Sequence, residues 1–339
     1  AFILLILFSP VDPSPSPSES TYLTPSSPST PQSLSTLSSP PTLHLSVVVP
    51  AYNESLRLGV MLRPAIEYLE TRSLDQLESS TSLPEGVERG SYEVLIVDDG
   101  SKDDTVQIAL ELARELEREF GAKRGKVKVC SLVRNRGKGG ATKHGVMHAS
   151  GHRILFVDAD GATDFSDLSL LESELDALER IQEPSPTTLT RHGIIVGSRA
   201  HLVSTEAVVK RSLLRNLLMR SFHLYLSLLG LRSIRDTQCG FKLHSRSSAL
   251  HLYPSLHSPG WIFDCELLLL AELSGIPLRE VGVRWHEVGG SKLDVVWDSV
   301  RMARDLVVIR ANHWTGRWKS PRKVEVRYRE EKKEEKKEK

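Results

Sequence analysis

Short runs of apolar, often β-branched residues alternate with longer stretches that carry apolar residues at helical spacing. The short runs predict strands at 45–50, 92–97, 127–133, 153–157 and 194–197, and a further one within 278–285. The longer stretches predict helices at 54–72, from Asp103 or Asp104, from Ala141, and at 209–230, 263–274 and 294–312. This order predicts an α/β fold, with a mostly parallel central sheet and helices on both faces.

The two ends of the chain differ in composition from this alternating part. Residues 1–8 are all apolar but are too few to cross a bilayer, which needs about 20 residues. We expect them to be the remnant of an N-terminal membrane anchor, with the end of a signal peptide as the alternative. Residues 9–43 are dominated by Ser, Pro and Thr and predict a disordered tether. The folded domain is then expected at 44–320, followed by a solvated charged tail at 321–339.

Charge and cysteine content exclude some classes of function. The formal net charge of +1 indicates no bulk attraction to nucleic acid. Cys130, Cys239 and Cys265 are odd in number and lack the spacing of a metal site. We therefore expect reduced thiols in a chain that faces the cytosol.

Two acidic clusters follow predicted strands directly. Asp98 and Asp99 end the run at 94–97, and Asp158-Ala159-Asp160 ends the run at 154–157. Parallel strands bring their carboxyl ends to one edge of a sheet, where α/β folds bind ligands. Two carboxylates one residue apart suit a divalent cation that also holds a diphosphate. Solvated loop acids are the alternative for one cluster, but the repeated form favours a metal and diphosphate site.

Other polar motifs are predicted to reach the same edge. Pro50, Tyr52 and Glu54 close the first strand and offer a ring for a base and an acid for sugar hydroxyls. The glycine-rich turn at 134–141 carries Arg136 and Lys138 and opens a helix, an arrangement that suits a phosphate, although a basic surface turn is the alternative. Three more motifs are Gly197-Ser198-Arg199, the polar segment 235–243 with Asp236 and Gln238, and the loop Gly289-Gly290-Ser291-Lys292. Arg199 is a good phosphate partner, or else forms an ordinary surface salt bridge.

Taken together and in this order, the motifs resemble those of the inverting glycosyltransferases of family 2, which have the GT-A nucleotide-sugar fold. The similarity runs from about residue 45 to 318, and its most specific segments are 135–141, 158–163, 197–201 and 234–243. Within this family the chain is most similar to the eukaryotic members that glucosylate dolichyl phosphate. The members that transfer mannose share the Asp-Ala-Asp pattern but differ around 135–141 and 234–243.

The resemblance implies transfer of glucose from UDP-glucose to dolichyl phosphate, which supplies a donor for N-linked glycan assembly. It also implies a single-pass N-terminal anchor in the endoplasmic reticulum membrane, with the catalytic domain facing the cytosol. The uridine-binding residues would be Pro50, Tyr52, Glu54, Val97 and Asp99. Asp158, Ala159 and Asp160 would lie along the diphosphate, with Asp158 and Asp160 holding Mg²⁺ or Mn²⁺. Arg199 and Lys292 would contact phosphates, and Asp236 with Gln238 would lie near the acceptor or the glucose hydroxyls.

The acceptor simplifies the chemistry, because a phosphate monoester with a second pKa of about 6 is already a nucleophile at neutral pH. The remaining task is to hold two anionic groups in line and to stabilise the UDP leaving group. Three rivals stay open: a mannosyltransferase that uses the same lipid, a transferase for another polyprenyl phosphate, and a nucleotide-sugar-binding protein with an inactive site. A processive polysaccharide synthase is disfavoured, since the chain lacks its Gln-X-X-Arg-Trp motif and its several membrane spans.

Overall fold

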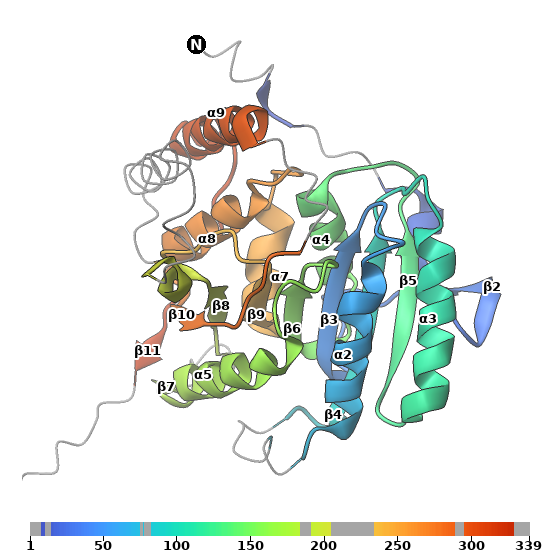
Figure 1. Cartoon of the computed structure of the whole chain (residues 1–339). Coiled ribbons are helices and arrows are strands. Elements are labelled where there is room, and N and C mark those ends of the chain that lie inside the picture. The colour runs from blue at the N-terminus through green and yellow to red at the C-terminus, as the bar shows by residue number, and fades with distance from the viewer. Residues whose placement is uncertain are drawn as a thin grey trace, which may run out of the picture.

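The computed structural model describes residues 8–10, 15–74, 77, 83–183, 191–204, 234–288 and 295–328. Within these residues a nine-stranded sheet has the order β10-β8-β9-β6-β3-β4-β5-β1-β2 (Figure 1). Its strands are β1 (Thr21–Thr24), β2 (Ser27–Ser33), β3 (Leu43–Ala51), β4 (Glu88–Asp98), β5 (Gly125–Ser131), β6 (Gly151–Val157), β8 (Ile194–Ser198), β9 (Phe241–Ser245) and β10 (Leu278–Gly282). A separate pair joins β7 (Gln182–Glu183) to β11 (Arg327–Tyr328).

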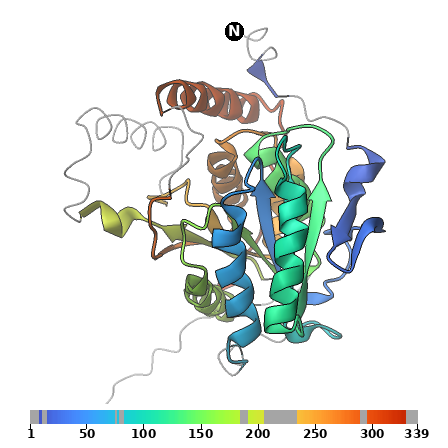
Figure 2. The ribbon, with the colours of Figure 1, turned by 45° about the vertical axis from the view of Figure 1, so that its right-hand side comes forward.

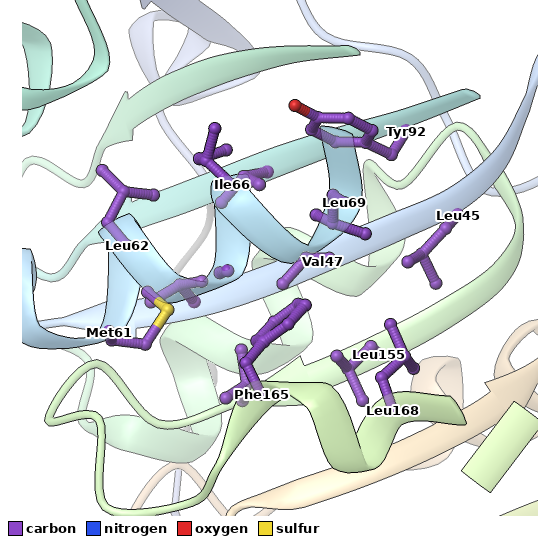
Figure 3. Packing of buried hydrophobic residues seen from close by; sticks show 14 of the residues in the cluster. Leu45, Val47, Met61, Leu62, Ile66, Leu69, Tyr92, Leu155, Phe165 and Leu168 are labelled. Atoms are coloured by element: carbon purple, nitrogen blue, oxygen red, sulfur yellow. The ribbon is translucent and has the colours of Figure 1, made fainter. Parts of the chain in front are cut away.

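Helices cover both faces of the sheet, as predicted. They are α2 (Leu58–Thr71), α3 (Thr105–Phe120), α4 (Lys138–Met147), α5 (Leu168–Arg180), α7 (Arg246–Leu252) and α8 (Phe263–Ser274), and α9 (Val295–Trp314) packs on α8. Side chains of a strand alternate between the faces, so Val47 and Val49 of β3 pack with α2, α3 and α5, whereas Val48 packs in the core of α4, α7 and α8. Figure 3 shows the first of these cores, where Met61, Leu62, Ile66 and Leu69 of α2 lie over β3.

The strand order reverses beside β3, and this reversal places the candidate site. The chain runs from β3 outward to β4 and β5, all parallel, and then returns to β6 on the other side of β3. The carboxyl ends of β3, β4 and β6 therefore meet, which is where open α/β sheets bind ligands. This side of the sheet is called the carboxyl edge below.

Strand β9 runs against its neighbours β6 and β8. Its first residue, Phe241, pairs with Val157, the last residue of β6. The polar segment that precedes β9 consequently starts at the carboxyl edge, next to Asp158. Only β1 and β9 run against the other strands of the sheet, so its mostly parallel character agrees with the prediction.

The structure differs from the predicted disordered tether at 9–43, because residues 15–43 are ordered against the sheet. A short 3-10 helix (Pro17–Ser20) leads into β1, which pairs with both β2 and β5. Figure 2 shows this dark blue segment at the outer edge of the sheet, beside β5. Leu37 is buried, and the guanidinium of Arg246 donates to its carbonyl at 2.9 Å. These contacts are tertiary, which is why the Ser/Pro/Thr composition gave no sign of them.

The ends of the chain call for two more corrections. No helix in the described ranges is both long and apolar enough to cross a membrane, and this finding overturns the predicted single-pass N-terminal anchor. Residues 1–7 and the predicted helix at 209–230 lie outside those ranges. The predicted solvated tail is not wholly free of the domain, since Arg327–Tyr328 form β11 and the Val324 amide donates to the Ser274 carbonyl at 2.8 Å.

Candidate functional site

The first acidic cluster and the glycine-rich turn form one unit. Asp99 follows β4 and is only 2% exposed. Its Oδ1 accepts the amide of Arg136 at 2.6 Å, and its Oδ2 accepts the amide of Gly137 at 2.8 Å. Burial raises the pKa of Asp99 to about 7, although these two amides act in the opposite direction. Asp99 thus fixes the turn that opens α4.

Glycine is required where the two segments touch. Gly100 has a φ of +69°, and a Cβ on it would lie 2.9 Å from the backbone nitrogen of Asn135. Gly137 has a φ of +83°, and a Cβ on it would lie 2.5 Å from the carbonyl oxygen of Pro259. The turn is therefore packed between the end of β4 and the loop that precedes α8.

The segment after β3 lies next to this unit. Pro50 pairs with Val97 in the parallel register of β3 and β4, so both reach the carboxyl edge. Asn53 has a φ of 53°, and its Oδ1 accepts the amide of Lys102 at 2.8 Å. Glu54 is buried and forms an ion pair with Arg57, with Oε1 and Nη2 separated by 2.6 Å. Tyr52 beside it is half-buried.

The second acidic cluster is paired with the ammonium group of a lysine. Lys138 Nζ lies 2.7 Å from Asp158 Oδ1, and Asp158 N donates to the carbonyl of Gly240 at 3.0 Å. Asp160 Oδ1 accepts the amide of Ala162 at 3.0 Å. Burial raises the pKa of Asp160, and the neighbouring charge of Asp158 raises it further. The two carboxylates repel each other, a situation that a divalent cation between them relieves.

A fully buried ion pair lies behind Lys138. Lys242 Nζ is 2.6 Å from Asp264 Oδ1 and donates to the carbonyl of Cys239 at 2.6 Å. Burial lowers the pKa of Lys138, but Asp158 and then Asp264 more than offset this, so its pKa is raised. The ammonium of Lys138 also lies 5.5 Å from the ring centre of Trp261. Neither Lys242 nor Asp264 was predicted as a site residue; a lysine between apolar residues of β9 was the available signal.

Arg199 and Asp236 form a two-pronged pair at the end of β8. Arg199 Nε lies 2.7 Å from Asp236 Oδ2 and Nη2 lies 2.8 Å from Oδ1, while the Arg199 amide also donates to Oδ2. Burial opposes ionisation of Asp236, but the Arg199 hydrogen bonds hold its pKa below the usual value. The guanidinium carbon lies 5.5 Å from the ring centre of Trp285, a residue that the sequence analysis missed. Arg199 was predicted to contact a phosphate and Asp236 to lie near the acceptor or the glucose hydroxyls, whereas in the structure the two side chains form an ion pair with each other.

Two other candidates, Arg136 and Gln238, have different surroundings from those predicted. The guanidinium of Arg136 donates to the buried carboxylate of Glu19, and the Arg136 side chain is only 7% exposed. Gln238 Nε2 donates to Met302 Sδ of α9 at 3.2 Å. Lys292 lies outside the described residues. Ala159, between the two acids, is buried at 4% exposure.

Glu266, in the first turn of α8, supports a neighbouring loop. Its Oε2 accepts the amide of Ser258 at 2.6 Å, and both carboxylate oxygens lie 3.1 Å from the amide of His257. The His257 ring stacks on Trp318, with ring centres 4.2 Å apart. In the same loop the Pro259 carbonyl accepts the amide of Gly140 at 3.1 Å. Glu266 therefore acts on the glycine-rich turn through this loop.

The three cysteines agree with the sequence analysis. Cys130, Cys239 and Cys265 are free and buried in the structure. Burial raises the pKa of each thiol to about 12, so they are neutral core residues without nucleophilic character.

Comparison with known proteins identifies the family. The model of glycosyl transferase family 2 matches residues 46–182. The dolichyl-phosphate beta-glucosyltransferase of Saccharomyces cerevisiae is 43% identical over 283 residues, which cover 83% of this chain and 78% of the relative. The enzyme of the same name from Mus musculus is 45% identical, with 82% and 78% covered.

Solved structures with a similar fold include glucosyl-3-phosphoglycerate synthase of Mycobacterium tuberculosis. Its complex with UDP is 19% identical and covers 79% of both chains, with a TM-score of 0.47. Its complex with Mn²⁺, UDP-glucose and glycerol 3-phosphate is 20% identical, again with 79% of both chains covered and a TM-score of 0.46. On the identity and coverage of its curated relatives, the chain belongs to the dolichyl-phosphate β-glucosyltransferases of glycosyl transferase family 2, which have the GT-A fold.

Proposed function

We propose that this protein transfers glucose from UDP-glucose to dolichyl phosphate with inversion, giving dolichyl β-D-glucosyl phosphate and UDP. The observation that carries the proposal is the Asp158-Ala159-Asp160 cluster at the end of β6, with Lys138 Nζ 2.7 Å from Asp158. Two carboxylates, one ammonium and the Arg199–Asp236 pair lie around the same edge in a member of a family named for this reaction. Charged groups of both signs suit a substrate pair that is itself highly charged.

A divalent cation fits the second acidic cluster. Asp158 and Asp160 offer the oxygen ligands that Mg²⁺ and Mn²⁺ prefer. Burial and the charge of Asp158 raise the pKa of Asp160, and a cation held by the two carboxylates would counteract both effects. When bound, the cation would supply positive charge to the diphosphate of the donor.

The donor would lie across the ends of β3 and β4. Pro50, Tyr52, Glu54 and Val97 surround the place proposed for uridine, and Asp99 orders the turn beside it. The start of α4, with Lys138 and Lys292, would face the phosphates. The pKa of Lys138 is raised, so its ammonium keeps its proton and stabilises the departing UDP by charge rather than as an acid.

The acceptor needs orientation more than activation. A phosphate oxygen of the lipid forms the new bond to the anomeric carbon, while the bond to the UDP oxygen breaks and its electron pair leaves with UDP. Because the phosphate monoester is largely ionised at neutral pH, this step requires no strong base. Arg199, Asp236 and Gln238 would position the acceptor and the glucose hydroxyls on the face opposite UDP.

A donor competition assay tests this proposal. The purified protein is given detergent-dispersed dolichyl phosphate with radiolabelled UDP-glucose, GDP-mannose or UDP-N-acetylglucosamine, and the lipid product is counted. Glucose transfer at least about tenfold faster than transfer of the other sugars is expected. Faster mannose transfer would instead identify a mannosyltransferase. Nucleotide binding without any transfer would identify a binding protein with an inactive site.

A further inference from the structure

A buried carboxylate outside the region matched by the family model reaches into the donor side of the site. Glu19 lies in residues 15–33, called the strap here, which precede the matched residues 46–182. It is 1% exposed, and its Oε1 accepts the amide of Val133 at 2.9 Å. Its Oε2 accepts from the guanidinium of Arg136 and from the amide of Ser16, the latter at 2.6 Å. Burial disfavours the charge, but the amides and Arg136 hold the pKa of Glu19 below the usual value.

The backbone carbonyl of Glu19 also contacts residues next to the glycine-rich turn. Its carbonyl oxygen lies 2.7 Å from Nε2 of His144 in α4 and accepts from Cys130 Sγ at 3.2 Å. One strap residue therefore contacts the end of β5, the glycine-rich turn and the helix that follows it. The strap itself is held in place by the pairing of Leu23 in β1 with Val129 in β5.

Arg136 is consequently fixed at two points. Asp99 holds its amide, and Glu19 holds its guanidinium, which lies buried instead of facing a ligand. An always-charged guanidinium is costly to bury without a paired acid. Without the carboxylate of Glu19, the buried guanidinium would lose this acid partner, and the turn would depend on Asp99 and on the Pro259 carbonyl that accepts the Gly140 amide.

We propose that Glu19 is a positioning residue for the donor: its ion pair with Arg136 sets the glycine-rich turn, so the strap completes the nucleotide-sugar site. The identity of the donor as UDP-glucose rests on the proposed function above. The order imposed on the turn does not depend on that identity, which allows the two proposals to be tested separately.

The test compares Glu19→Gln, Arg136→Met and the double variant in steady-state kinetics. Glutamine keeps an oxygen for the Val133 amide but replaces the oxygen that accepts from Arg136 and from the Ser16 amide with a donating NH2 group. We expect KM for UDP-glucose to rise about tenfold, with kcat and the KM for dolichyl phosphate within about twofold of the original chain. Because both residues act as one pair, the double variant should resemble either single variant.

The control is Tyr22→Phe, which removes a 2.9 Å hydrogen bond to Gln32 inside the strap but touches neither Arg136 nor the turn. Its kinetics should be unchanged. Hydrogen exchange supplies a readout that needs no activity: the amides of Arg136 and Gly137 should exchange about tenfold faster in Glu19→Gln than in Tyr22→Phe.

Two results would overturn the inference. One is unchanged exchange and unchanged KM in Glu19→Gln. The other is a far larger loss in Arg136→Met than in Glu19→Gln, which would show that Arg136 contacts the donor directly. If the original chain fails to transfer glucose, the proposed function fails, while the exchange comparison still decides the role of Glu19.

Discussion

Asp99 is a buried carboxylate whose ionisation should control donor binding near neutral pH. Its pKa is raised to about 7 by burial, so the group is mainly protonated at pH 6 and mainly ionised at pH 8. The ionised form accepts the amides of Arg136 and Gly137 more strongly and orders the turn. We predict that UDP-glucose, titrated calorimetrically without acceptor, binds up to about tenfold more tightly at pH 8 than at pH 6.

The matched variant is Asp99→Asn, which cannot ionise and should bind with little dependence on pH. The diphosphate of UDP-glucose does not titrate in this range, so it adds no pH dependence of its own. An identical pH dependence in both proteins would show that another group is responsible. The stability of the fold should have the opposite pH dependence. Because burial raises the pKa of Asp99 in the folded state, the protonated carboxyl stabilises the fold, and the free energy of unfolding should fall as pH rises from about 4 to 7.

Asp160 is expected to be essential for metal-dependent transfer. Asp160→Asn keeps the shape of the side chain but removes one of the two negative charges proposed to bind the cation. Transfer with added Mg²⁺ or Mn²⁺ should fall at least about 100-fold, with an unchanged thermal unfolding curve. Asp164→Asn is the control, since Asp164 lies four residues away in an exposed ion pair with Arg284. Near-normal turnover of Asp160→Asn in a chelator would refute the metal assignment.

Among the elements, the turn before α4 is the one whose backbone shape matters most. Gly137→Ala places a Cβ 2.5 Å from the Pro259 carbonyl at a φ of +83°. Gly316 offers a matched control, because its φ is +71° but a Cβ there would have nothing within 4 Å. Gly316→Ala should cost about 1–3 kcal/mol of unfolding free energy through backbone strain, and Gly137→Ala should cost more because its Cβ also meets the Pro259 backbone. Only Gly137→Ala should also raise KM for UDP-glucose; equal kinetics in the two variants would contradict a role for the turn.

Elements with a strong local pattern could be predicted from the sequence, and those built by distant contacts could not. The apolar run before Asp158 predicted a strand at 153–157, and β6 spans Gly151–Val157. The strap has no such run, and its order depends on pairing with β5 and on the burial of Glu19. Strand β9 was not predicted, and its antiparallel position between β6 and β8 is set by partners far along the chain.

The whole molecule determines how the site residues are paired. The apolar run that precedes each of Asp99, Asp158 and Arg199 was enough to predict that all three lie at one edge of the sheet. Their partners come from elsewhere: Arg199 meets Asp236 37 positions later, and Arg136 meets Glu19 117 positions earlier. No local pattern encodes such pairs, so the sequence indicated the residue types of the site but not which charge neutralises which.

The buried Lys242–Asp264 pair links the core to this edge and gives the last prediction. Lys242→Met should lower the free energy of unfolding by about 3–5 kcal/mol, because Asp264 stays buried without its partner. The double variant Lys242→Met with Asp264→Leu should recover most of that loss, as two apolar side chains replace the pair. Transfer should nevertheless stay reduced in the double variant, since Lys138 loses the second acid whose negative charge attracts its ammonium.

Urea unfolding measures these differences, and Arg279→Met is the control. Arg279 lies 3.0 Å from Glu174 with both side chains more than a third exposed, so its loss should cost no more than about 1 kcal/mol. If the double variant is as unstable as Lys242→Met, the loss does not come from the unpaired charge of Asp264, and the pair stabilises the fold through other contacts. A double variant with full activity would mean that Asp158 alone is sufficient to hold the ammonium of Lys138 at the carboxyl edge.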